Sequence, residues 1–270
     1  MKREICIVGR GSRLAMMQNE RIADLLKKEG YAVRIMTVKT LGDRDRKSPV
    51  TQLGGNGPFV RDVEKALLSG EADIAVHCVK DLPYELAPGL CIAGMPDAAD
   101  PRDCLLLRRG AAEATKASGQ PLVIGTGSPR RIRQLQKLAA REQYQVECRD
   151  IRGNITTRLD KLMRGEYDGI VLAKAGLDRI HADLGELSVR VLEPEEMIPA
   201  VGQGMLACEC REDDEELRAL LARMTPAENE LRYRIEREIF CRYRCDCRSA
   251  VGIYARIENG GAELLLMYEE

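Results

Sequence analysis

Short apolar runs alternate with amphipathic stretches along this chain, which is the pattern of an α/β fold. Residues Glu4 to Val8 and Ala32 to Val38 are predicted strands because they are short, mostly apolar runs. Between them, Leu14 to Lys28 is amphipathic with helical spacing, and Ser12 is placed to cap that helix. We therefore expect the chain to open with a strand, a helix and a second strand.

A polar, glycine-rich stretch, residues 40–57, follows and includes the tetrapeptide Gly54-Gly55-Asn56-Gly57. It has no clear period, and loops of this length inside compact domains are usually functional or mobile. A helix is then predicted over Val60 to Leu68, and a short buried strand over Ile74 to Val79.

Two charged side chains, Lys80 and Asp81, stand at the end of that strand, before Pro83 stops it. In open α/β sheets, ligands bind beyond the carboxyl ends of strands. A carboxylate beside a lysine there can serve as a general acid and base whose pKa is set by its neighbours. A solvated pair of charges is the simpler interpretation of this stretch when it is taken alone.

Two sequence motifs recur in the same order. Ile7–Ser12 is repeated by Val123–Ser128, where a strand passes through Gly-x-Gly-Ser into a helix. Gly70–Val76 is repeated by Gly165–Val171, where a helix is followed by an apolar strand. Two repeats in register predict two α/β domains of like topology with a cleft between them.

The two predicted domains differ at the acid, because Asp81 aligns with Gly176. The stretches Asp97–Arg102 and Pro194–Gly204 are expected to cross between the domains.

A small third unit is predicted at the end of the chain. Thr225 is expected to cap a helix with Pro226 in its first turn, and Leu231, Ile235 and Ile239 to form the buried face of that helix. A cysteine-rich loop and two short strands follow. This unit is too short to hold much core alone.

With 270 residues the chain is long enough for two domains and a small third. No apolar run approaches the roughly 18 residues of a membrane span, and the N-terminus enters a strand without a signal-peptide core. We therefore expect a cytoplasmic protein. Its ten cysteines are expected to be reduced thiols rather than a disulfide framework.

The net charge of −1, from 42 basic and 43 acidic residues, argues against nucleic acid as a partner. The chain has no tryptophan and two phenylalanines, so it offers few platforms for base stacking. Any basic site must therefore be local.

Basic residues gather around the two Gly-x-Gly-Ser turns, where backbone N–H groups and a helix N-terminus favour anions. Arginine forks pair with carboxylates or phosphates. Neither turn has the Gly-x-Gly-x-x-Gly spacing of a dinucleotide site, so we predict a basic cleft for a small polyanion. Arg13 and Arg133 are better explained as solvated helix faces. The residues concerned are Arg10, Arg13, Arg61, Lys80, Arg130, Arg131, Arg133, Arg152 and Arg158.

Cys241, Cys245 and Cys247 lie among three arginines, and positive charge lowers the pKa of a thiol toward reactivity. A structural zinc site is the competing hypothesis, but its spacing is poor because Cys-x-x-Cys pairs are missing. Cys208 and Cys210 complete a zinc set only if the fold brings them near. Packed, unreactive side chains are expected for Cys6, His77, Cys78, Cys91, Cys104 and Cys148.

Seven ordered blocks of sequence resemble the porphobilinogen deaminase, or hydroxymethylbilane synthase, family. The resemblance implies a transferase of tetrapyrrole (haem and corrin) biosynthesis that joins four porphobilinogen molecules head to tail, with release of ammonia. The growing chain is held on a dipyrromethane primer bound to a cysteine by a thioether, and the acetate and propionate groups of each pyrrole account for the arginines. The blocks are Gly9–Ser12, Gly54–Phe59, Ala75–Pro83, Gly125–Arg131, Arg152–Arg158, Leu172–Leu177 and Pro199–Gly204.

The resemblance also implies the fold class: two similar periplasmic-binding-protein-like α/β domains with mixed sheets around a cleft, and a small, shortened α+β third domain. Residues 1–98 with 196–217 are expected to form the domain of the acid, and residues 99–195 the domain of the anion-binding arginines. Residues 218–270 are expected to carry the cofactor-anchor loop. A cytoplasmic monomer is expected, with a small-molecule substrate and no metal, nucleic acid or membrane partner.

By the same resemblance, Asp81 is the catalytic carboxylate and Cys247 the covalent anchor, with Cys245 as the alternative. The residues implied to bind the cofactor are Ser12, Lys80, Thr126, Ser128, Arg130, Arg131 and Arg152. Those implied to bind the substrate are Arg10, Arg152, Arg158 and Gln203.

The chain departs from the family pattern at two places. A Gly-Gly-Lys-Gly block reads Gly54-Gly55-Asn56-Gly57 here, which removes a cation. The Gly-Gly-Cys-Gln approach to the anchor reads Cys245-Asp246-Cys247-Arg248, where Asp246 adds a negative charge and Arg248 can offset it. Asn56 and the shortened third domain motivate the alternative hypothesis, a catalytically impaired, two-domain binding protein for porphobilinogen or another small polycarboxylate.

Overall fold

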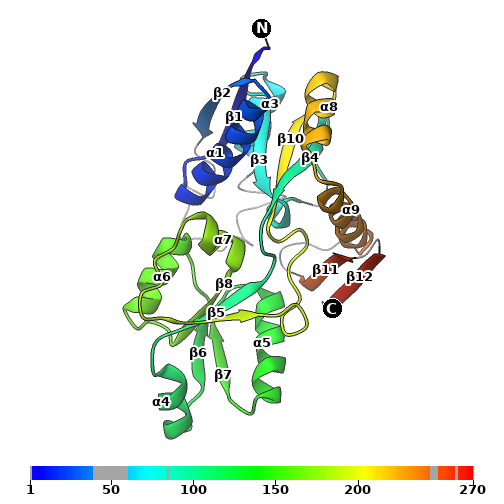
Figure 1. The fold of residues 1–270 in the computed structure, drawn as a ribbon. Coiled ribbons are helices and arrows are strands. Elements are labelled where there is room, and N and C mark those ends of the chain that lie inside the picture. Colours follow the sequence, from blue (N-terminus) through cyan, green and yellow to red (C-terminus); the bar gives the residue numbers. More distant parts are fainter. Residues whose placement is uncertain (1, 39–59, 84, 244–248, 259–260, 270) are drawn as a thin grey trace. The chain divides into compact units, whose positions relative to one another are not determined.

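The computed structural model describes residues 2–38, 60–83, 85–243, 249–258 and 261–269 (Figure 1). The chain packs into two compact units. Unit 1 comprises the described residues of Met1–Ala99 and Met205–Arg244, and unit 2 those of Asp100–Gly204 and Cys245–Glu270. The predicted stretch 40–57 and the anchor candidates Cys245 and Cys247 lie outside the described residues.

Unit 1 is built on a five-stranded mixed sheet with the strand order β2-β1-β3-β10-β4. Strand β1 is parallel to β2 and β3, while β10 is antiparallel to β3 and β4. Its elements are β1 (Glu4–Arg10), α1 (Arg13–Lys28), β2 (Ala32–Val38), α3 (Arg61–Leu68), β3 (Ile74–Cys78), the 3₁₀ turn η2 (Val79–Asp81), β4 (Leu90–Ala98), β10 (Met205–Arg211), α8 (Glu215–Met224) and α9 (Ala227–Arg242).

Unit 2 holds a second five-stranded sheet with the order β7-β6-β8-β5-β9. Strand β6 is parallel to β7 and β8, while β5 is antiparallel to β8 and β9. Its elements are β5 (Asp103–Leu107), α4 (Ala111–Ser118), β6 (Leu122–Gly125), α5 (Pro129–Arg141), β7 (Val146–Arg149), α6 (Ile155–Met163), β8 (Gly169–Ala173), α7 (Lys174–Arg179), β9 (Ser188–Leu192), β11 (Ala250–Glu258) and β12 (Gly261–Glu269).

The two sheets have the same topology, which confirms the internal repeat and the predicted α/β class with two similar mixed-sheet domains. Strands β1, β2, β3, β10 and β4 of unit 1 correspond in order and direction to β6, β7, β8, β5 and β9 of unit 2. Each sheet is buried on both faces. In unit 1, α1 and α8 cover Ile5 and Ile7, and α3 covers Cys6 and Val8 on the opposite face.

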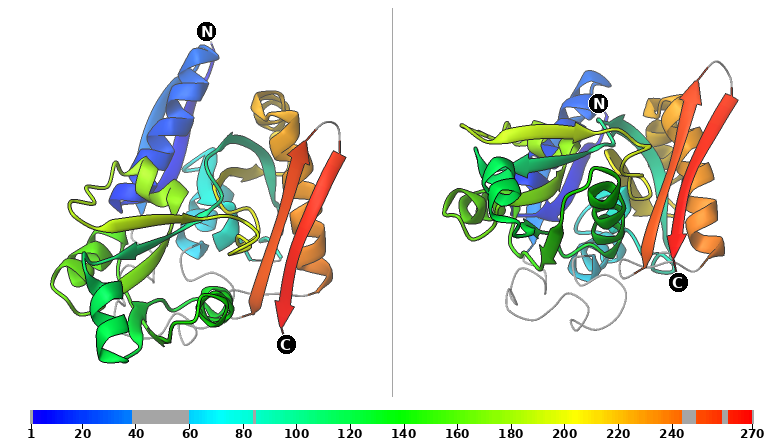
Figure 2. Two further views of the ribbon diagram at one scale, coloured as in Figure 1. Left: turned by 60° about the horizontal axis from the view of Figure 1, so that its bottom comes forward. Right: turned by 90° about the horizontal axis from the view of Figure 1, so that it is seen from below.

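Strands β11 and β12 form a separate antiparallel pair at the end of the chain (Figure 2). Within unit 2 this pair packs on α5 and on the stretch before β10, because Ile253 donates its N–H to the Pro199 carbonyl at 3.0 Å. A Cβ at Gly252 would lie 2.9 Å from the Ile198 carbonyl oxygen, so glycine permits this close approach. Whether residues 218–270 form a domain of their own stays a prediction.

Helix α9 differs from its prediction. Thr225 does not cap it: the Thr225 hydroxyl accepts the Met95 N–H at 2.9 Å and donates to the Leu221 carbonyl at 2.8 Å. The expected buried face is also wrong, since Leu231 is 41% exposed while Arg232 and Glu236 are buried. These charged residues pack inward because they pair with each other at 2.7 Å, which offsets the cost of removing them from water.

Candidate functional site

The carboxyl ends of β1 and β3 bring four predicted site residues to one edge of the unit 1 sheet. The two strands are parallel neighbours, with Ile7 opposite Ile74. Strand β1 ends at Arg10, and β3 leads directly into the turn Val79–Asp81. We call this set edge 1, and it comprises Arg10, Ser12, Lys80 and Asp81.

Ser12 ends the strand-to-helix turn of edge 1 as predicted. Its hydroxyl accepts the Ala15 N–H at 3.3 Å and so caps α1. The first turn of α1 contains no acidic side chain. The positive end of the helix dipole therefore faces edge 1 without a carboxylate of that turn to oppose it, which favours anions there.

Asp81 is exposed on a turn whose two ends are buried. Val79 and Leu82 are 1% and 4% exposed and pack with Met95 and Met205 in one cluster. The Leu82 N–H also donates to the Val79 carbonyl at 3.1 Å, which closes the turn. The fold thus fixes the backbone around Asp81 while its carboxylate stays open to a ligand.

A buried polar pair lies in the strand before this turn. His77 Nε2 lies 2.9 Å from Glu209 Oε2 on β10, and both side chains are buried. Burial raises the pKa of the nearby Glu64, and the negative charge of Glu209 adds to that rise. The prediction that His77 is a packed strand residue is confirmed.

Helix α9 contacts residues around the turn that carries Asp81. Asn229 donates to the Met95 carbonyl at 2.9 Å, Tyr233 packs in the cluster of Val79 and Leu82, and Arg237 donates to the Pro83 carbonyl. The spacing of four residues puts these three side chains on one helix face. Sequence reasoning missed Arg237; the i, i+4 spacing of Arg232 and Glu236 was the signal that charge is buried on this helix.

Unit 2 gathers its predicted residues at the corresponding edge of its own sheet, which we call edge 2. Thr126 follows β6, the Ser128 hydroxyl accepts the Arg131 N–H at 3.5 Å to cap α5, and Arg152 follows β7. Edge 2 comprises Thr126, Ser128, Arg130, Arg131 and Arg152. The two edges confirm that the Gly-x-Gly-Ser turns are strand-to-helix turns.

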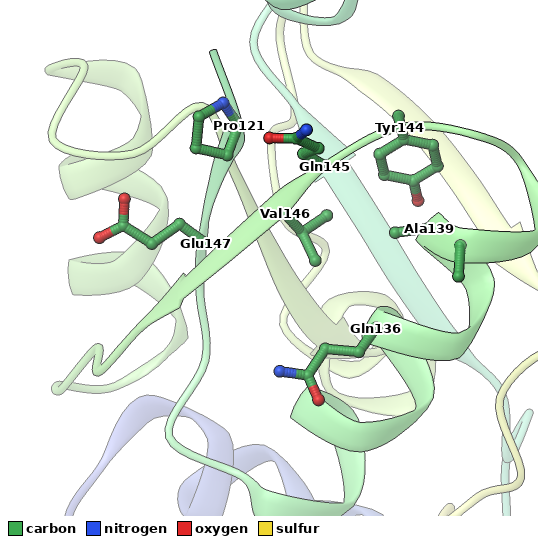
Figure 3. Close-up of a pocket in the computed structure, with 8 residues that line it drawn as sticks. Pro121, Gln136, Ala139, Tyr144, Gln145, Val146 and Glu147 are labelled. Carbon is green, nitrogen blue, oxygen red and sulfur yellow. The ribbon is translucent and has the colours of Figure 1, made fainter.

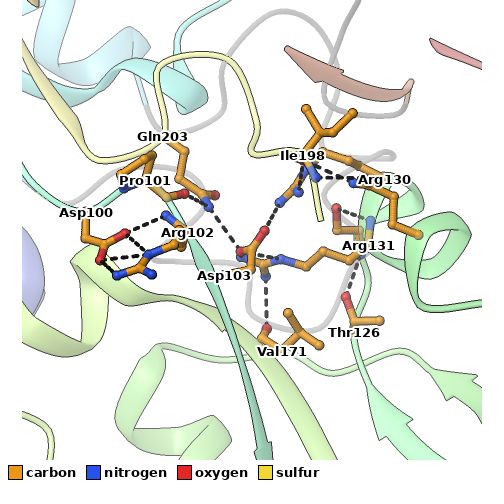
Figure 4. A network of polar contacts seen from close by, with 12 residues as sticks. Asp100, Pro101, Arg102, Asp103, Thr126, Arg130, Arg131, Val171, Ile198 and Gln203 are labelled. Atoms are coloured by element: carbon orange, nitrogen blue, oxygen red, sulfur yellow. Dashed lines mark hydrogen bonds and ion pairs between the residues drawn. The ribbon is translucent and has the colours of Figure 1, made fainter. Parts of the chain in front are cut away.

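Arg130 and Arg131 of edge 2 are buried and share the carboxylate of Asp103 (Figure 4). Asp103, 0% exposed, lies at 2.8 Å from a terminal nitrogen of Arg130 through one oxygen and at 2.7 Å from one of Arg131 through the other. Each arginine has a second acceptor, the Ile198 carbonyl for Arg130 and the Val171 carbonyl for Arg131. The guanidinium groups are therefore held from both sides.

The charges of these three side chains sum to one positive charge, because two guanidinium groups share one carboxylate. Burial lowers the pKa of Arg130, and the charge of Asp103 acts against that shift. A buried excess of positive charge is costly unless an anion compensates it. Edge 2 is thus suited to a ligand carboxylate.

Gln203 lies in the same network rather than at a free edge. It is 1% exposed, and its amide donates to the Pro101 carbonyl at 2.6 Å and to Asp103 at 3.1 Å. Arg152 pairs with Asp150 at 2.9 Å, and Arg158 donates to the Gly153 carbonyl at 2.8 Å. Both arginines are partly exposed.

The described cysteines are free thiols, as predicted. Burial raises the pKa of Cys104 to about 11 and that of Cys210 to about 12, and it also raises the pKa values of Cys6, Cys91 and Cys148. Within the described part of the chain, no group of three or more His, Cys, Asp or Glu side chains is arranged to hold a metal ion. No helix in that part is long and apolar enough to cross a membrane.

A hollow of about 420 Å³ lies at the opposite end of the unit 2 sheet (Figure 3). Pro121 before β6, Val146 at the start of β7 and Ala139 near the end of α5 line it. None of the predicted site residues in the described part of the chain does, so it is separate from edge 2.

The two units share one sheet topology, and each has a Gly-x-Gly-Ser turn that leads from a strand into a capped helix, so the chain is a protein of the α/β class with two like mixed-sheet domains. Its edges carry an exposed acid and buried arginines. Residues 5–219 match the family model described as "Porphobilinogen deaminase, dipyromethane cofactor binding domain". The chain belongs to the porphobilinogen deaminase family.

Curated relatives match over nearly the whole chain. A porphobilinogen deaminase from Roseiflexus sp. (strain RS-1) is 40% identical over 268 residues, which are 98% of this chain and 85% of the relative. One from Bacillus anthracis is 42% identical over 265 residues, 97% of this chain and 84% of the relative. A solved ABC transporter structure from Parabacteroides distasonis aligns with 89% of this chain and 74% of its own at 15% identity and a TM-score of 0.45. The family assignment rests on the sequence matches.

Proposed function

We propose that this chain is a hydroxymethylbilane synthase, a transferase that condenses four porphobilinogen molecules head to tail with release of ammonia. The structural observation that carries the proposal is Asp81, exposed on a turn whose flanking residues Val79 and Leu82 are buried. A fixed backbone with an open carboxylate suits a general acid and base that must meet successive substrates.

Asp81 is proposed to give a proton to the departing amino group and to take one from the ring that has reacted. Between these steps its carboxylate offsets the positive charge that develops on the substrate pyrrole. The positive charge of Lys80 and the N-terminus of α1 attract the acidic groups of the substrate toward edge 1. Edge 1 therefore serves both the acid and the acidic groups of the substrate.

The residues of edge 2 fit a dipyrromethane cofactor, whose acetate and propionate groups are anions. The positive charge left by Arg130, Arg131 and Asp103 and the capped N-terminus of α5 match such groups. When bound, the cofactor supplies the pyrrole carbon to which the first substrate is joined. Its proposed holders in this chain are Ser12, Lys80, Thr126, Ser128, Arg130, Arg131, Arg152 and the thiol of Cys247, or alternatively Cys245.

Substrate carboxylates are proposed to bind Arg10, Arg152, Arg158 and Gln203. For Gln203 the contribution is indirect, because its amide donor is engaged by Pro101 and Asp103. We further propose a cytoplasmic monomer that needs no metal and has neither nucleic acid nor a membrane as partner. The net charge of −1 supports the absence of a nucleic-acid partner.

Intact-mass measurement of the purified protein tests this function. We expect a mass above that of the polypeptide by two pyrrole units, lost in Cys247→Ser and kept in Cys241→Ser, a matched cysteine outside the anchor candidates. Loss in Cys245→Ser instead would move the anchor to Cys245. Bare polypeptide mass, no consumption of porphobilinogen and yet measurable porphobilinogen binding would favour the impaired binding protein.

A further inference from the structure

Asp103 occupies a position that the repeated fold fills with an apolar residue in the other unit. In unit 2, Asp103 at the start of β5 lies opposite Ala173 of β8, and in unit 1, Leu206 of β10 lies opposite Cys78 of β3. Because β5 corresponds to β10 and β8 to β3, Asp103 and Leu206 are equivalent. Leu206 is fully buried.

The two arginines replace apolar residues in the same way. Ser12 caps α1 through the Ala15 N–H, and Ser128 caps α5 through the Arg131 N–H, so Ala15 is equivalent to Arg131. One residue earlier, Leu14 is equivalent to Arg130. Unit 2 therefore holds three charged side chains where unit 1 holds leucine, leucine and alanine.

The architecture itself does not require these charges, because unit 1 builds it without them. Buried ion pairs cost desolvation, and apolar replacements of similar volume are often as stable. Asp103 is accordingly needed by Arg130 and Arg131 rather than by the fold. A single unpaired buried guanidinium would be strongly unfavourable, and two would be worse.

Asp103 is placed to set the direction of both guanidinium groups. One of its oxygens accepts Nε and a terminal nitrogen of Arg131, at 3.1 and 2.7 Å, and the other faces Arg130 at 2.8 Å. Gln203 donates to the same carboxylate at 3.1 Å. Figure 4 draws these contacts as dashed lines around the Asp103 carboxylate.

We propose that Asp103 is a positioning residue that orients Arg130 and Arg131 and cancels one of their two charges, leaving one for a ligand carboxylate. The proposal rests on the proposed function, which supplies the carboxylate ligand. Without Asp103 the guanidinium groups of Arg130 and Arg131 are no longer held in one orientation. Edge 2 then binds the cofactor poorly even if the protein still folds.

The test compares Asp103→Asn, which keeps the shape and removes the charge, with Asp100→Asn as the control. Asp100 also pairs with an arginine, but its partner is Arg102, at 2.7 Å, rather than Arg130 or Arg131. We expect at least a tenfold fall in the fraction of protein that carries the pyrrole adduct in Asp103→Asn and none in the control. Nε–Hε NMR signals of Arg130 and Arg131 should shift and broaden in Asp103→Asn alone.

Unchanged arginine signals with full loading in Asp103→Asn would overturn the proposal. If Asp103→Asn does not fold, the triple variant Asp103→Leu, Arg130→Leu, Arg131→Ala, which copies unit 1, decides. A folded triple variant shows that the fold does not need these charges and supports the proposal, whereas an unfolded one shows that the network is a structural requirement and overturns it. A wild-type protein without adduct would sink the proposed function, while the NMR signals still judge the positioning role.

Discussion

Asp73 and Asp168 hold equivalent positions in the two sheets, and each accepts a backbone N–H from the neighbouring strand. Asp73 accepts that of Cys6 at 2.8 Å, and Asp168 that of Val123 at 3.0 Å. An arginine pairs with each carboxylate: Arg211 with Asp73 at 3.4 Å and Arg108 with Asp168 at 3.0 Å. The repeat thus preserves a polar clamp as well as strand order.

Removing either clamp should destabilise the protein, because a backbone N–H loses its acceptor and an arginine loses one of its acceptors. We expect Asp73→Ala and Asp168→Ala each to lower the free energy of unfolding by about 1–3 kcal/mol. Asp24→Ala removes an exposed pair with Lys27 and serves as the control; it should change little. Urea unfolding measures all three, and a loss no larger than that of the control would contradict the role of the clamp.

Asp81→Asn should abolish most turnover and leave stability unchanged. Loss of a general acid and base typically costs about 10²–10⁴ in rate. Because Asp81 is exposed, its replacement should move the melting temperature by no more than about 2 °C. Porphobilinogen consumption and thermal unfolding measure the two effects. Turnover near the wild-type rate would remove Asp81 from the chemistry, and Glu85→Gln is a nearby control.

The ion pair of Arg190 with Glu142 predicts a pH-dependent contribution to stability. A hydrogen bond from Arg190 lowers the pKa of Glu142 below its ordinary value of 4.5. A carboxyl group whose pKa is lower in the folded than in the unfolded state stabilises the fold at pH values above its ordinary pKa. This stabilisation is lost as the pH falls through the folded-state pKa. Arg190→Gln should therefore destabilise at pH 7 by about 0.5 kcal/mol, since the pair is partly exposed.

Urea unfolding of wild type and Arg190→Gln between pH 7 and pH 2 checks this sign. The difference between the two proteins should shrink at the acid end. A difference that grows as pH falls would be inconsistent with a lowered pKa of Glu142.

The buried pair of Arg232 and Glu236 predicts a large effect from a single change. Glu236→Gln removes the negative charge that lies 2.7 Å from the buried Arg232 guanidinium, and we expect this break of a buried ion pair to lower the unfolding free energy by about 3–5 kcal/mol. The exposed Arg234→Gln on the same helix should cost at most about 0.5 kcal/mol. If Glu236→Gln and Arg234→Gln unfold alike in urea, the inward charged face of α9 is not stabilising.

Buried thiols should resist alkylation in the folded protein. Cys104 and Cys210 have raised pKa values, so little thiolate forms at pH 8. With iodoacetamide, peptide mass mapping should show Cys148, which is partly exposed on β7, labelled before either of them. Adding urea should make all three react. Equal labelling in the folded state would contradict their burial.

Much of the fold could be predicted from local pattern. Apolar runs located β1, β2 and β3, Ser12 caps the helix assigned to it, and the repeated motifs revealed two like domains. The motifs misplaced the strand by one residue: they align Ile7 with Val123, whereas the clamp aligns Cys6 with Val123. Parallel register depends on contacts between strands, which no local motif records.

Helix α9 shows where periodicity fails. Leu231, Ile235 and Ile239 have the spacing of a buried face, yet the face that packs on unit 1 carries Arg232 and Glu236. The groups that a helix contacts in the fold decide which of its faces is buried. On α9 the buried charges of Arg232 and Glu236 pair with each other, and the Pro83 carbonyl accepts a hydrogen bond from Arg237. Local hydrophobicity contains no information about those partners.

The sequence by itself determined the α/β class, the internal repeat and Asp81 at the end of a strand, because these depend on residues close together in the chain. Tertiary structure alone decided that Asp103, far from Arg130 and Arg131 in sequence, meets both guanidinium groups inside unit 2. The pairing of β5 with β8 and the Ser128 cap of α5 place these side chains next to each other. Long-range pairing of buried charges is therefore the part of this site that only the folded chain reveals.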